Sequence, residues 1–144
     1  MTTGKEIPAL GHALRTLSPV ECFDLLEPGG IGRVAFTSAG GVTILPVNFA
    51  MTGKTLVFRT APDTLLAVYA NAQVSFEADR LDDALHEGWS VLVPGRAHEV
   101  TDEREVKPLE DRTHVEPWAG GARDVYVRIA PPRISGRRIL SGQE

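Results

Sequence analysis

Residues 31–60 have the sequence IGRVAFTSAGGVTILPVNFAMTGKTLVFRT, and this stretch decides the expected fold. Three apolar runs, at 31–38, 42–50 and 55–60, are separated by two turns that contain glycine. Short runs rich in β-branched and aromatic residues, joined by such turns, predict an antiparallel meander. Pro46 has no N–H group for a strand ladder, so its strand is expected to be bulged or to lie at an edge there.

Helices and further strands are expected on both sides of this meander. Ser18, Pro19 at the first helical position and Glu21 predict a capped helix that ends before residues 28–30. A helix at 63–72 is expected to turn Leu65, Val68, Tyr69 and Ala72 toward the core. The other expected elements are strands at 73–79, 88–100, 125–129 and 134–139, a polar loop at 80–87, and a helix within 102–111 that Pro108 limits.

This pattern defines a mainly β fold with short helices, made of six to seven antiparallel strands. A closed or nearly closed barrel buries such strands and removes free sheet edges. Residues 1–16 show no clear periodicity and are expected to form an N-terminal extension, and residues 17–144 are expected to form a single domain.

Composition excludes several classes of function. The chain has 144 residues, 42% hydrophobic and 24% charged, with a net charge of −4 and one cysteine. These values argue against a nucleic-acid or membrane-binding surface and against an intrachain disulfide. The first residues lack the apolar core of a signal peptide, so a cytoplasmic protein is expected. Its four histidines have no metal-ligand spacing, so no metal site is expected.

The segment LVFRTAPDTLLA, residues 56–67, contains a candidate anion site. The planar guanidinium of an arginine can donate two parallel hydrogen bonds to a phosphate group. Arg59 stands at the end of an apolar run, next to Thr60. Thr64 opens the helix that follows and adds a second hydroxyl group. The same residues are also compatible with a solvated strand end and a helix capped by Asp63, so the segment alone leaves both interpretations open.

Three other places contain candidate binding residues. Asn48 is polar within the apolar run ILPVNFA, and its amide can satisfy local backbone groups or bind the edge of a planar heterocycle. Trp89, beside Ser90 in GWSVLVPG, can belong to the core or pack on a ligand or a partner subunit. Trp118 lies in a segment rich in proline and glycine and has the same alternatives.

The chain contains a series of short motifs in a characteristic order. They are GRVAF, ILPVNF, LVFRTAP, VSFEAD, GWSVLVPGRAHEV, PWAGGARD, VYVRI and GRRI. This order resembles the pyridoxamine 5'-phosphate oxidase-like, FMN-binding split-barrel family, and is most similar to its small actinobacterial flavin- or deazaflavin-dependent members. The resemblance covers about residues 17–140 and implies a split barrel, a homodimer and two cofactor sites at the dimer interface.

The resemblance also implies site residues. Arg59 and Thr60 would grip the phosphate of FMN, or of an 8-hydroxy-5-deazaflavin coenzyme, and Thr64 would assist. The residues implied at the rest of the site are Pro46, Val47 and Asn48 along the isoalloxazine ring, Trp89 and Ser90 near it, plausibly contributed across the dimer, and Trp118 as a closing residue. No side chain is identified as catalytic.

The expected function is an oxidoreductase that transfers a hydride to or from a small planar substrate in this cleft. Here Leu65 follows Thr64 where the related pattern commonly has lysine, and Asp63 stands where glycine is usual. Losing that positive charge supports the alternative, a non-catalytic dimer that binds a flavin, a haem or another ligand on the same barrel.

Overall fold

The computed structural model describes residues 13–113, 125–130 and 133–140. In these residues nine strands form one sheet, in the order β1-β9-β6-β5-β2-β3-β4-β8-β7, and every neighbouring pair is antiparallel. The elements are β1 (Ala13–Leu17), α1 (Pro19–Leu26), β2 (Gly30–Ser38), β3 (Gly41–Thr52), β4 (Thr55–Thr60), α2 (Leu65–Val68), β5 (Gln73–Asp82), β6 (Glu87–Arg96), β7 (His98–Val100), α3 (Glu103–Thr113), β8 (Val125–Ile129) and β9 (Ser135–Leu140).

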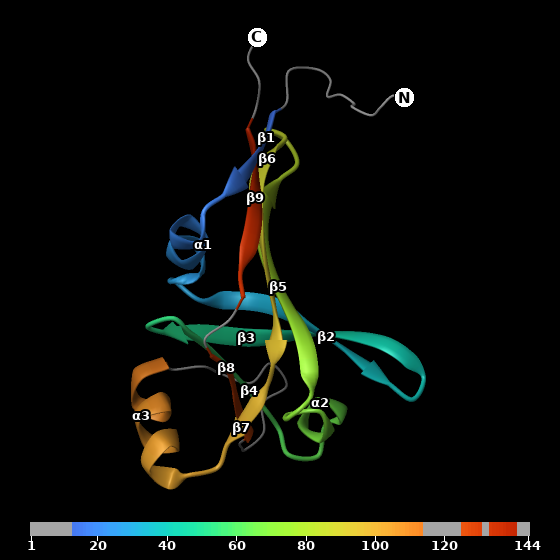
Figure 1. The fold of residues 1–144 in the computed structure, drawn as a ribbon, viewed down its shortest axis with the longest axis vertical. Coiled ribbons are helices and arrows are strands. Elements are labelled where there is room, and N and C mark those ends of the chain that lie inside the picture. Colours follow the sequence, from blue (N-terminus) through green and yellow to red (C-terminus); the bar gives the residue numbers. More distant parts are fainter. Residues whose placement is uncertain (1–12, 114–124, 131–132, 141–144) are drawn as a thin grey trace.

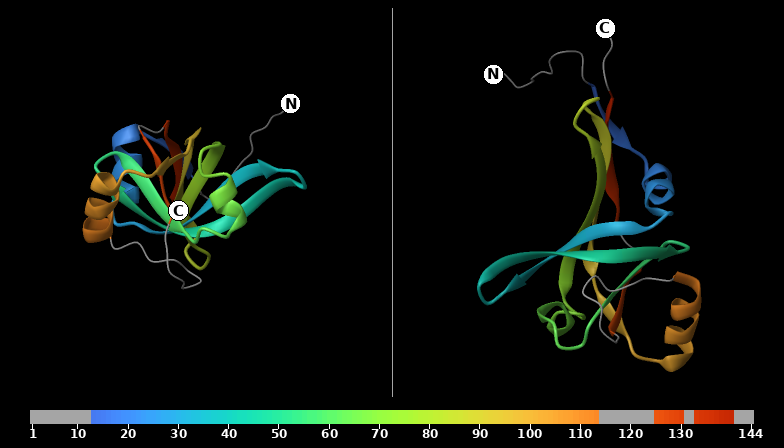
Figure 2. Two further views of the ribbon diagram at one scale, coloured as in Figure 1. Left: turned by 90° about the horizontal axis from the view of Figure 1, so that it is seen from below. Right: turned by 180° about the vertical axis from the view of Figure 1, so that it is seen from behind.

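The sheet is strongly curled. In Figure 1, β2 and β3 cross the middle of the molecule, whereas β9, β6 and β5 extend along its long axis on one side and β4, β7 and β8 lie on the other. Seen from below, the sheet curls round, and α1 and α3 lie at the periphery of the molecule (Figure 2). The expected mainly β antiparallel split barrel is confirmed.

The strand count exceeds the expected six to seven for two reasons. Residues 13–17 pair with β9, so the last part of the expected extension belongs to the sheet. The expected strand at 88–100 is divided at Ala97 into β6 and β7. The polar loop expected at 80–87 is also wrong, because residues 80–82 continue β5 and Glu87 already belongs to β6. Cross-strand pairing stabilises these polar residues in extended conformation without burying them.

The β2–β3–β4 meander is as expected. Phe49 pairs with Phe58, and the β3–β4 ladder continues from there to the turn at Gly53, which has a positive φ of 61°. Pro46 pairs with Arg33 of β2, but β4 no longer pairs with β3 at that point. On the side of β3 that faces β4, Pro46 therefore has no strand partner and its missing N–H group costs no ladder bond. This confirms the expected edge position.

The core lies between the inward faces of the curled sheet. Val34, Phe36, Val47, Phe49 and Phe58 alternate inward along the meander and are buried. The rings of Phe49 and Phe76 pack edge to face, with centroids 4.9 Å apart. Only glycine fits at position 32, because a Cβ atom there would collide with the Phe76 ring.

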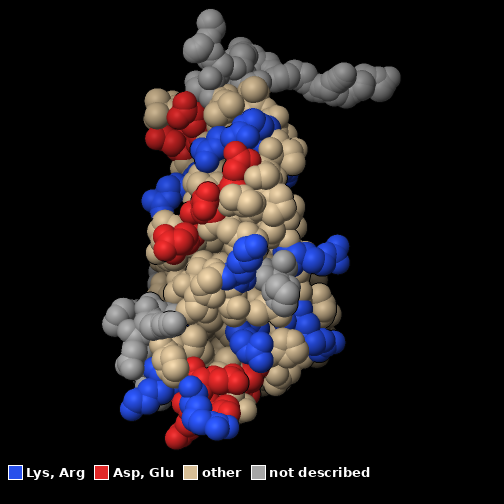
Figure 3. Space-filling view, turned by 60° about the vertical axis from the view of Figure 1, so that its left-hand side comes forward, with Lys and Arg blue, Asp and Glu red and all other residues tan. Residues whose placement is uncertain are grey.

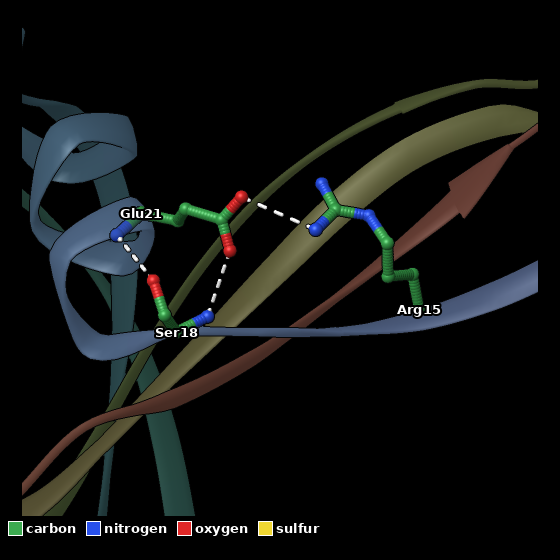
Figure 4. A network of polar contacts seen from close by, with 3 residues as sticks. All are labelled: Arg15, Ser18 and Glu21. Atoms are coloured by element: carbon green, nitrogen blue, oxygen red, sulfur yellow. Dashed lines mark hydrogen bonds and ion pairs between the residues drawn. The ribbon is translucent and has the colours of Figure 1, made fainter.

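Helix α1 has the predicted capping box (Figure 4). The backbone N–H of Glu21 donates to the Ser18 hydroxyl at 3.2 Å, and the backbone N–H of Ser18 donates to the Glu21 carboxylate at 2.8 Å. Arg15 of β1 donates to the same carboxylate at 3.2 Å. These hydrogen bonds and Arg15 hold the pKa of Glu21 below its usual value. The helix buries Cys22 and Leu26.

Helices α2 and α3 differ from expectation in length. In place of a helix at 63–72, only Leu65–Val68 is helical, and its buried side chain is Leu66, whereas Leu65 and Val68 are 48% and 73% exposed. The expected apolar face is therefore wrong for Leu65 and Val68, whereas Tyr69 packs against the core beside Phe36. Helix α3 extends past Pro108 instead of ending before it, and its Val106 and Leu109 pack against Val57, Val100 and Tyr126.

We predict that Ser18→Ala lowers the free energy of unfolding by about 1 kcal/mol, because it leaves the Glu21 N–H without its acceptor. Chemical denaturation measures the change. Ser18→Thr keeps the hydroxyl and should stay close to the wild-type value, and equal losses in the two variants would contradict a role for the cap.

Candidate functional site

Arg59 and Thr60 end strand β4 and leave it on opposite faces. Thr60 is buried and continues the inward set of Leu56 and Phe58, whereas Arg59 lies on the outer face and is half-buried. Arg59 pairs across the sheet with Tyr126 of β8. A ligand that contacts both Arg59 and Thr60 therefore has to lie at the end of the strand, beside the turn that leads to Thr64.

In the described part of the chain, the guanidinium of Arg59 is hydrogen-bonded through Nη1. Its Nη1 donates a hydrogen bond of 3.0 Å to the Tyr126 hydroxyl, and the guanidinium carbon lies 5.7 Å from the centre of the Tyr126 ring. Its Nε atom is buried and has no hydrogen-bond partner in the described part of the chain. A buried donor without an acceptor is costly, so Nε is a position at which an acceptor beyond the described residues would be stabilising.

The two threonine hydroxyls are connected to each other. Thr64 donates to the Ala61 carbonyl at 2.9 Å and accepts from the Ala67 N–H at 3.2 Å, which makes it the cap of α2. The hydroxyl of Thr60 lies 2.8 Å from that of Thr64 and has to donate to it, because the hydrogen of Thr64 is already in use. An anion gains a hydrogen bond from Thr60 or Thr64 only if one of these bonds is exchanged.

The residues around Thr64 change the expected electrostatics. Asp63 is exposed and does not cap α2, since Thr64 has that role. Leu65, which stands where the related pattern has a lysine, is half-exposed and therefore makes no core contact in place of the lost charge. Helix α2 is a single turn and adds little dipole to the site. The positive charge at this strand end therefore comes from Arg59.

The β3 residues lie beside β4 but divide between the two faces. Val47 is buried in the core, whereas Pro46 is exposed and Asn48 is half-buried on the outer face. Phe49 and Phe58 are the last paired residues of β3 and β4, and Asn48 and Arg59 are the next residues on each strand. Asn48 and Arg59 thus share the outer face just beyond the end of the β3–β4 ladder, and Val47 does not share that face.

Trp89 and Ser90 of β6 also point to opposite faces. Ser90 pairs with Asp79 of β5, and Trp89 pairs with Arg80. Trp89 lines a pocket of about 480 Å³ between β2 and β5, beside α1. The pocket contains none of the residues of the Arg59 strand end; its lining is Asp24, Leu25, Pro28, Gly29, Ile31, Phe49, Ala78, Asp79, Arg80 and Trp89.

Arg33, Glu77 and Asp79 form a charged cluster on the outer face that the sequence analysis missed. Nη1 of Arg33 lies 3.1 Å from the Glu77 carboxylate and 3.3 Å from that of Asp79. Burial, followed by the hydrogen bond and negative charge of Asp79, raises the pKa of Glu77 to about 7, against the opposing effect of Arg33. The alternation of VSFEAD could have placed both acids on one face, but their strand partner Arg33 was visible only in the fold.

Several expectations concern places that carry no site here. Trp118 lies outside the described residues. Within the described ranges, no group of three or more His, Cys, Asp or Glu residues is arranged to hold a metal ion. On the face that carries α1 and α3, acidic and basic side chains are intermixed (Figure 3). The described helices are all too short or too polar to cross a membrane.

Comparison with known proteins identifies the family. Residues 18–138 match the sequence profile of pyridoxamine 5'-phosphate oxidase. The chain is 35% identical over 127 residues to an uncharacterised protein of Mycobacterium tuberculosis, covering 84% of this chain and 82% of that protein. The protein therefore belongs to the pyridoxamine 5'-phosphate oxidase family.

Solved structures agree with this assignment. An FAD-binding protein from Mycobacterium smegmatis superposes with a TM-score of 0.73 at 38% identity, covering 86% of this chain and 97% of that one. An FAD-binding protein from Mesorhizobium loti superposes with a TM-score of 0.69 at 28% identity, covering 90% and 98% of the two chains. The split-barrel fold is thus shared with proteins that bind a flavin.

We predict a pH-dependent stability from the Glu77 cluster. The folded pKa of about 7 lies above the ordinary value of 4.5, so the folded protein binds this proton more tightly than the unfolded chain. The stabilisation is complete below the ordinary value and is lost as the pH rises through the folded value. Glu77→Gln should therefore become more stable than the wild type as the pH is raised from about 5 to about 8.

Denaturant titration at several pH values measures this difference. Glu27→Gln removes an exposed carboxylate from the end of α1 and is the matched control for the loss of one surface charge. A wild-type protein that gains stability over Glu77→Gln as the pH rises would contradict the assigned direction of the pKa shift.

Proposed function

We propose that this protein binds a flavin through the Arg59 strand end and works as a homodimeric flavin-dependent oxidoreductase. The observation that carries the proposal is the buried Nε of Arg59, which has no acceptor in the described part of the chain. A phosphate oxygen is a suitable acceptor, because an arginine presents two parallel N–H groups to it. The similarity to two FAD-binding proteins supports a flavin as the molecule that carries the phosphate.

The residues present fit a phosphate group. Arg59 supplies the charge, and Thr60 and Thr64 supply hydroxyls that can exchange their mutual bond for one to the ligand. Asn48, the next outer-face residue on β3, is placed to meet the polar edge of a flavin ring. FMN is the simplest ligand for this site, and FAD and an 8-hydroxy-5-deazaflavin coenzyme offer the same phosphate chemistry.

A second subunit would complete the cleft. On the outer face of β2 and β3, Val42 and Ile44 are exposed apolar side chains at adjacent outer-face positions of β3, and Ile31 is exposed farther along the ladder, beyond the Arg33–Pro46 pair. Exposed apolar surface of this kind marks association sites. In the proposed dimer, Trp89 and Ser90, which lie away from Arg59 within one chain, would reach the flavin from the other subunit.

The bound flavin would accept or deliver the hydride, and the protein would bind and orient it. Arg59 and the threonines would hold the phosphate, Asn48 would orient the ring, and the dimer cleft would exclude water from a small planar substrate. The described residues assign no side chain as general acid or base. A flavin that binds without turnover, with nicotinamide donors and electron acceptors supplied, would favour the non-catalytic alternative.

The first test is the ligand itself. We expect the purified protein to be yellow, or to bind FMN, FAD or a deazaflavin in titration, with a visible spectrum altered from that of the free molecule. Mass spectrometry of the small molecule that co-purifies from the native host would identify which flavin it is. A colourless protein that binds none of the three would refute the proposal.

We predict that Arg59→Ala lowers FMN affinity by at least about tenfold, because it removes a charge-assisted hydrogen bond. Isothermal titration or flavin fluorescence quenching measures the change. Arg104→Ala is the matched control, because the Arg104 side chain is 90% exposed on α3, and it should leave the affinity unchanged. Equal FMN affinities of Arg59→Ala and the wild type would contradict the assignment of Arg59 to the phosphate site.

We predict that Ile44→Glu weakens self-association, because it places a charge in the exposed apolar surface of β2 and β3. Analytical ultracentrifugation across a concentration series measures the monomer fraction. Leu14→Glu, at another exposed apolar position on β1, is the control and should leave the association unchanged. A wild-type protein that stays monomeric at every concentration would exclude the proposed dimer.

A further inference from the structure

Tyr126 is the side chain that contacts the candidate phosphate-binding arginine most closely. It pairs with Arg59 of β4 on one side and with Val100 of β7 on the other. Only 2% of its surface is exposed, although it carries a hydroxyl group. A buried hydroxyl needs a hydrogen-bond partner, and Arg59 Nη1 supplies it at 3.0 Å.

The Tyr126 ring is fixed by a small apolar cluster of its own. This cluster lies on the outer face of the sheet and is separate from the main core. Helix α3, which runs beside β7 and β8 in Figures 1 and 2, covers it. Its members are Val57, Val100 and Tyr126, with Val106 and Leu109 of α3 packed against them. The position of the hydroxyl group is therefore set by packing and does not depend on Arg59.

The atom that Tyr126 engages decides which part of Arg59 faces a ligand. A guanidinium offers paired N–H groups along two edges, one formed by Nε and Nη2 and the other by the two Nη atoms. Tyr126 takes Nη1, which belongs to the second edge only. Tyr126 does not engage the Nε–Nη2 edge, and the Nε of that edge is buried and has no hydrogen-bond partner in the described part of the chain.

We propose that Tyr126 is a positioning residue, which holds Arg59 by Nη1 so that the Nε–Nη2 edge receives the flavin phosphate. The α3 cluster acts through Tyr126 and keeps its hydroxyl in place. This inference rests on the proposed function, since it assigns a role toward the same ligand. The Tyr126 hydroxyl oxygen accepts from Arg59, and the role proposed for Tyr126 is exerted through that bond.

The test compares two ligands that differ only in the phosphate group. Tyr126→Phe keeps the ring in its cluster and removes the hydroxyl group. We expect it to lower FMN affinity roughly threefold to tenfold and to leave riboflavin affinity unchanged, because only FMN uses the arginine edge. A purely structural defect at Tyr126 would lower the affinities for both ligands together.

A double-mutant cycle tests whether Tyr126 acts through Arg59. In an Arg59→Ala background, Tyr126→Phe should have no further effect on FMN affinity, because the group that it positions is absent. Independent losses that add in the double variant would overturn the inference. So would a Tyr126→Phe variant that keeps the full wild-type preference for FMN over riboflavin.

A measurement on the wild-type protein covers the case in which Tyr126→Phe does not fold. In an NMR spectrum of arginine Nε–H groups, the Arg59 signal, identified by its absence from Arg59→Lys, should shift and exchange more slowly when FMN is added. Riboflavin should not produce the same change. An unchanged Arg59 signal in an FMN-saturated protein would overturn the inference.

The outcomes separate this inference from the proposed function. A wild-type protein that binds none of FMN, FAD and a deazaflavin refutes the proposed function, and the inference with it. The role of Tyr126 is refuted separately if the wild type binds FMN more tightly than riboflavin and Tyr126→Phe keeps the same ratio of the two affinities. That result leaves the proposed flavin site intact.

Discussion

The alternation of side chains at the end of β4 is the constraint on which the candidate site depends. Leu56, Phe58 and Thr60 point inward and pack against the main core, so Arg59 has to leave on the outer face. A slip of one residue in the β4 register would bury the arginine and expose the apolar residues. The burial of Phe58 therefore fixes the direction of Arg59, and the β8 register then brings Tyr126 beneath it.

Polar groups near this strand end are satisfied unequally, and the difference shapes the chemistry. The two threonines satisfy each other and the short helix that follows. Among the described residues, Arg59 has its Nη1 bonded to Tyr126, whereas its Nε is buried and has no partner. The Arg33–Glu77–Asp79 cluster, at the other end of the outer face, has two carboxylates for one arginine and holds a proton near neutrality. The Arg59 strand end thus has a hydrogen-bond donor without an acceptor among the described residues, whereas the Arg33–Glu77–Asp79 cluster has more carboxylates than cations.

Local pattern predicted the meander, the capping box and the mainly β class, because each depends on residues close together in the chain. It failed where tertiary packing opposed the local signal. The helix expected at 63–72 shrank to one turn, and its buried side chain is Leu66 instead of Leu65. The polar loop expected at 80–87 is confined to a turn at 83–86, because pairing between β5 and β6 stabilises residues 80–82 and 87 in extended conformation.

The sequence by itself determined the strand order of the central meander, the capped first helix and the presence of Arg59 at a strand end, since periodicity and turn residues act within a few positions. Only the tertiary structure decided which edge of Arg59 is available, that Trp89 lies in a pocket away from it, and that Arg33 joins two acids on a neighbouring strand. These contacts join residues 44 to 67 positions apart in the chain, and pairing at that range is set by the registers of the curled sheet.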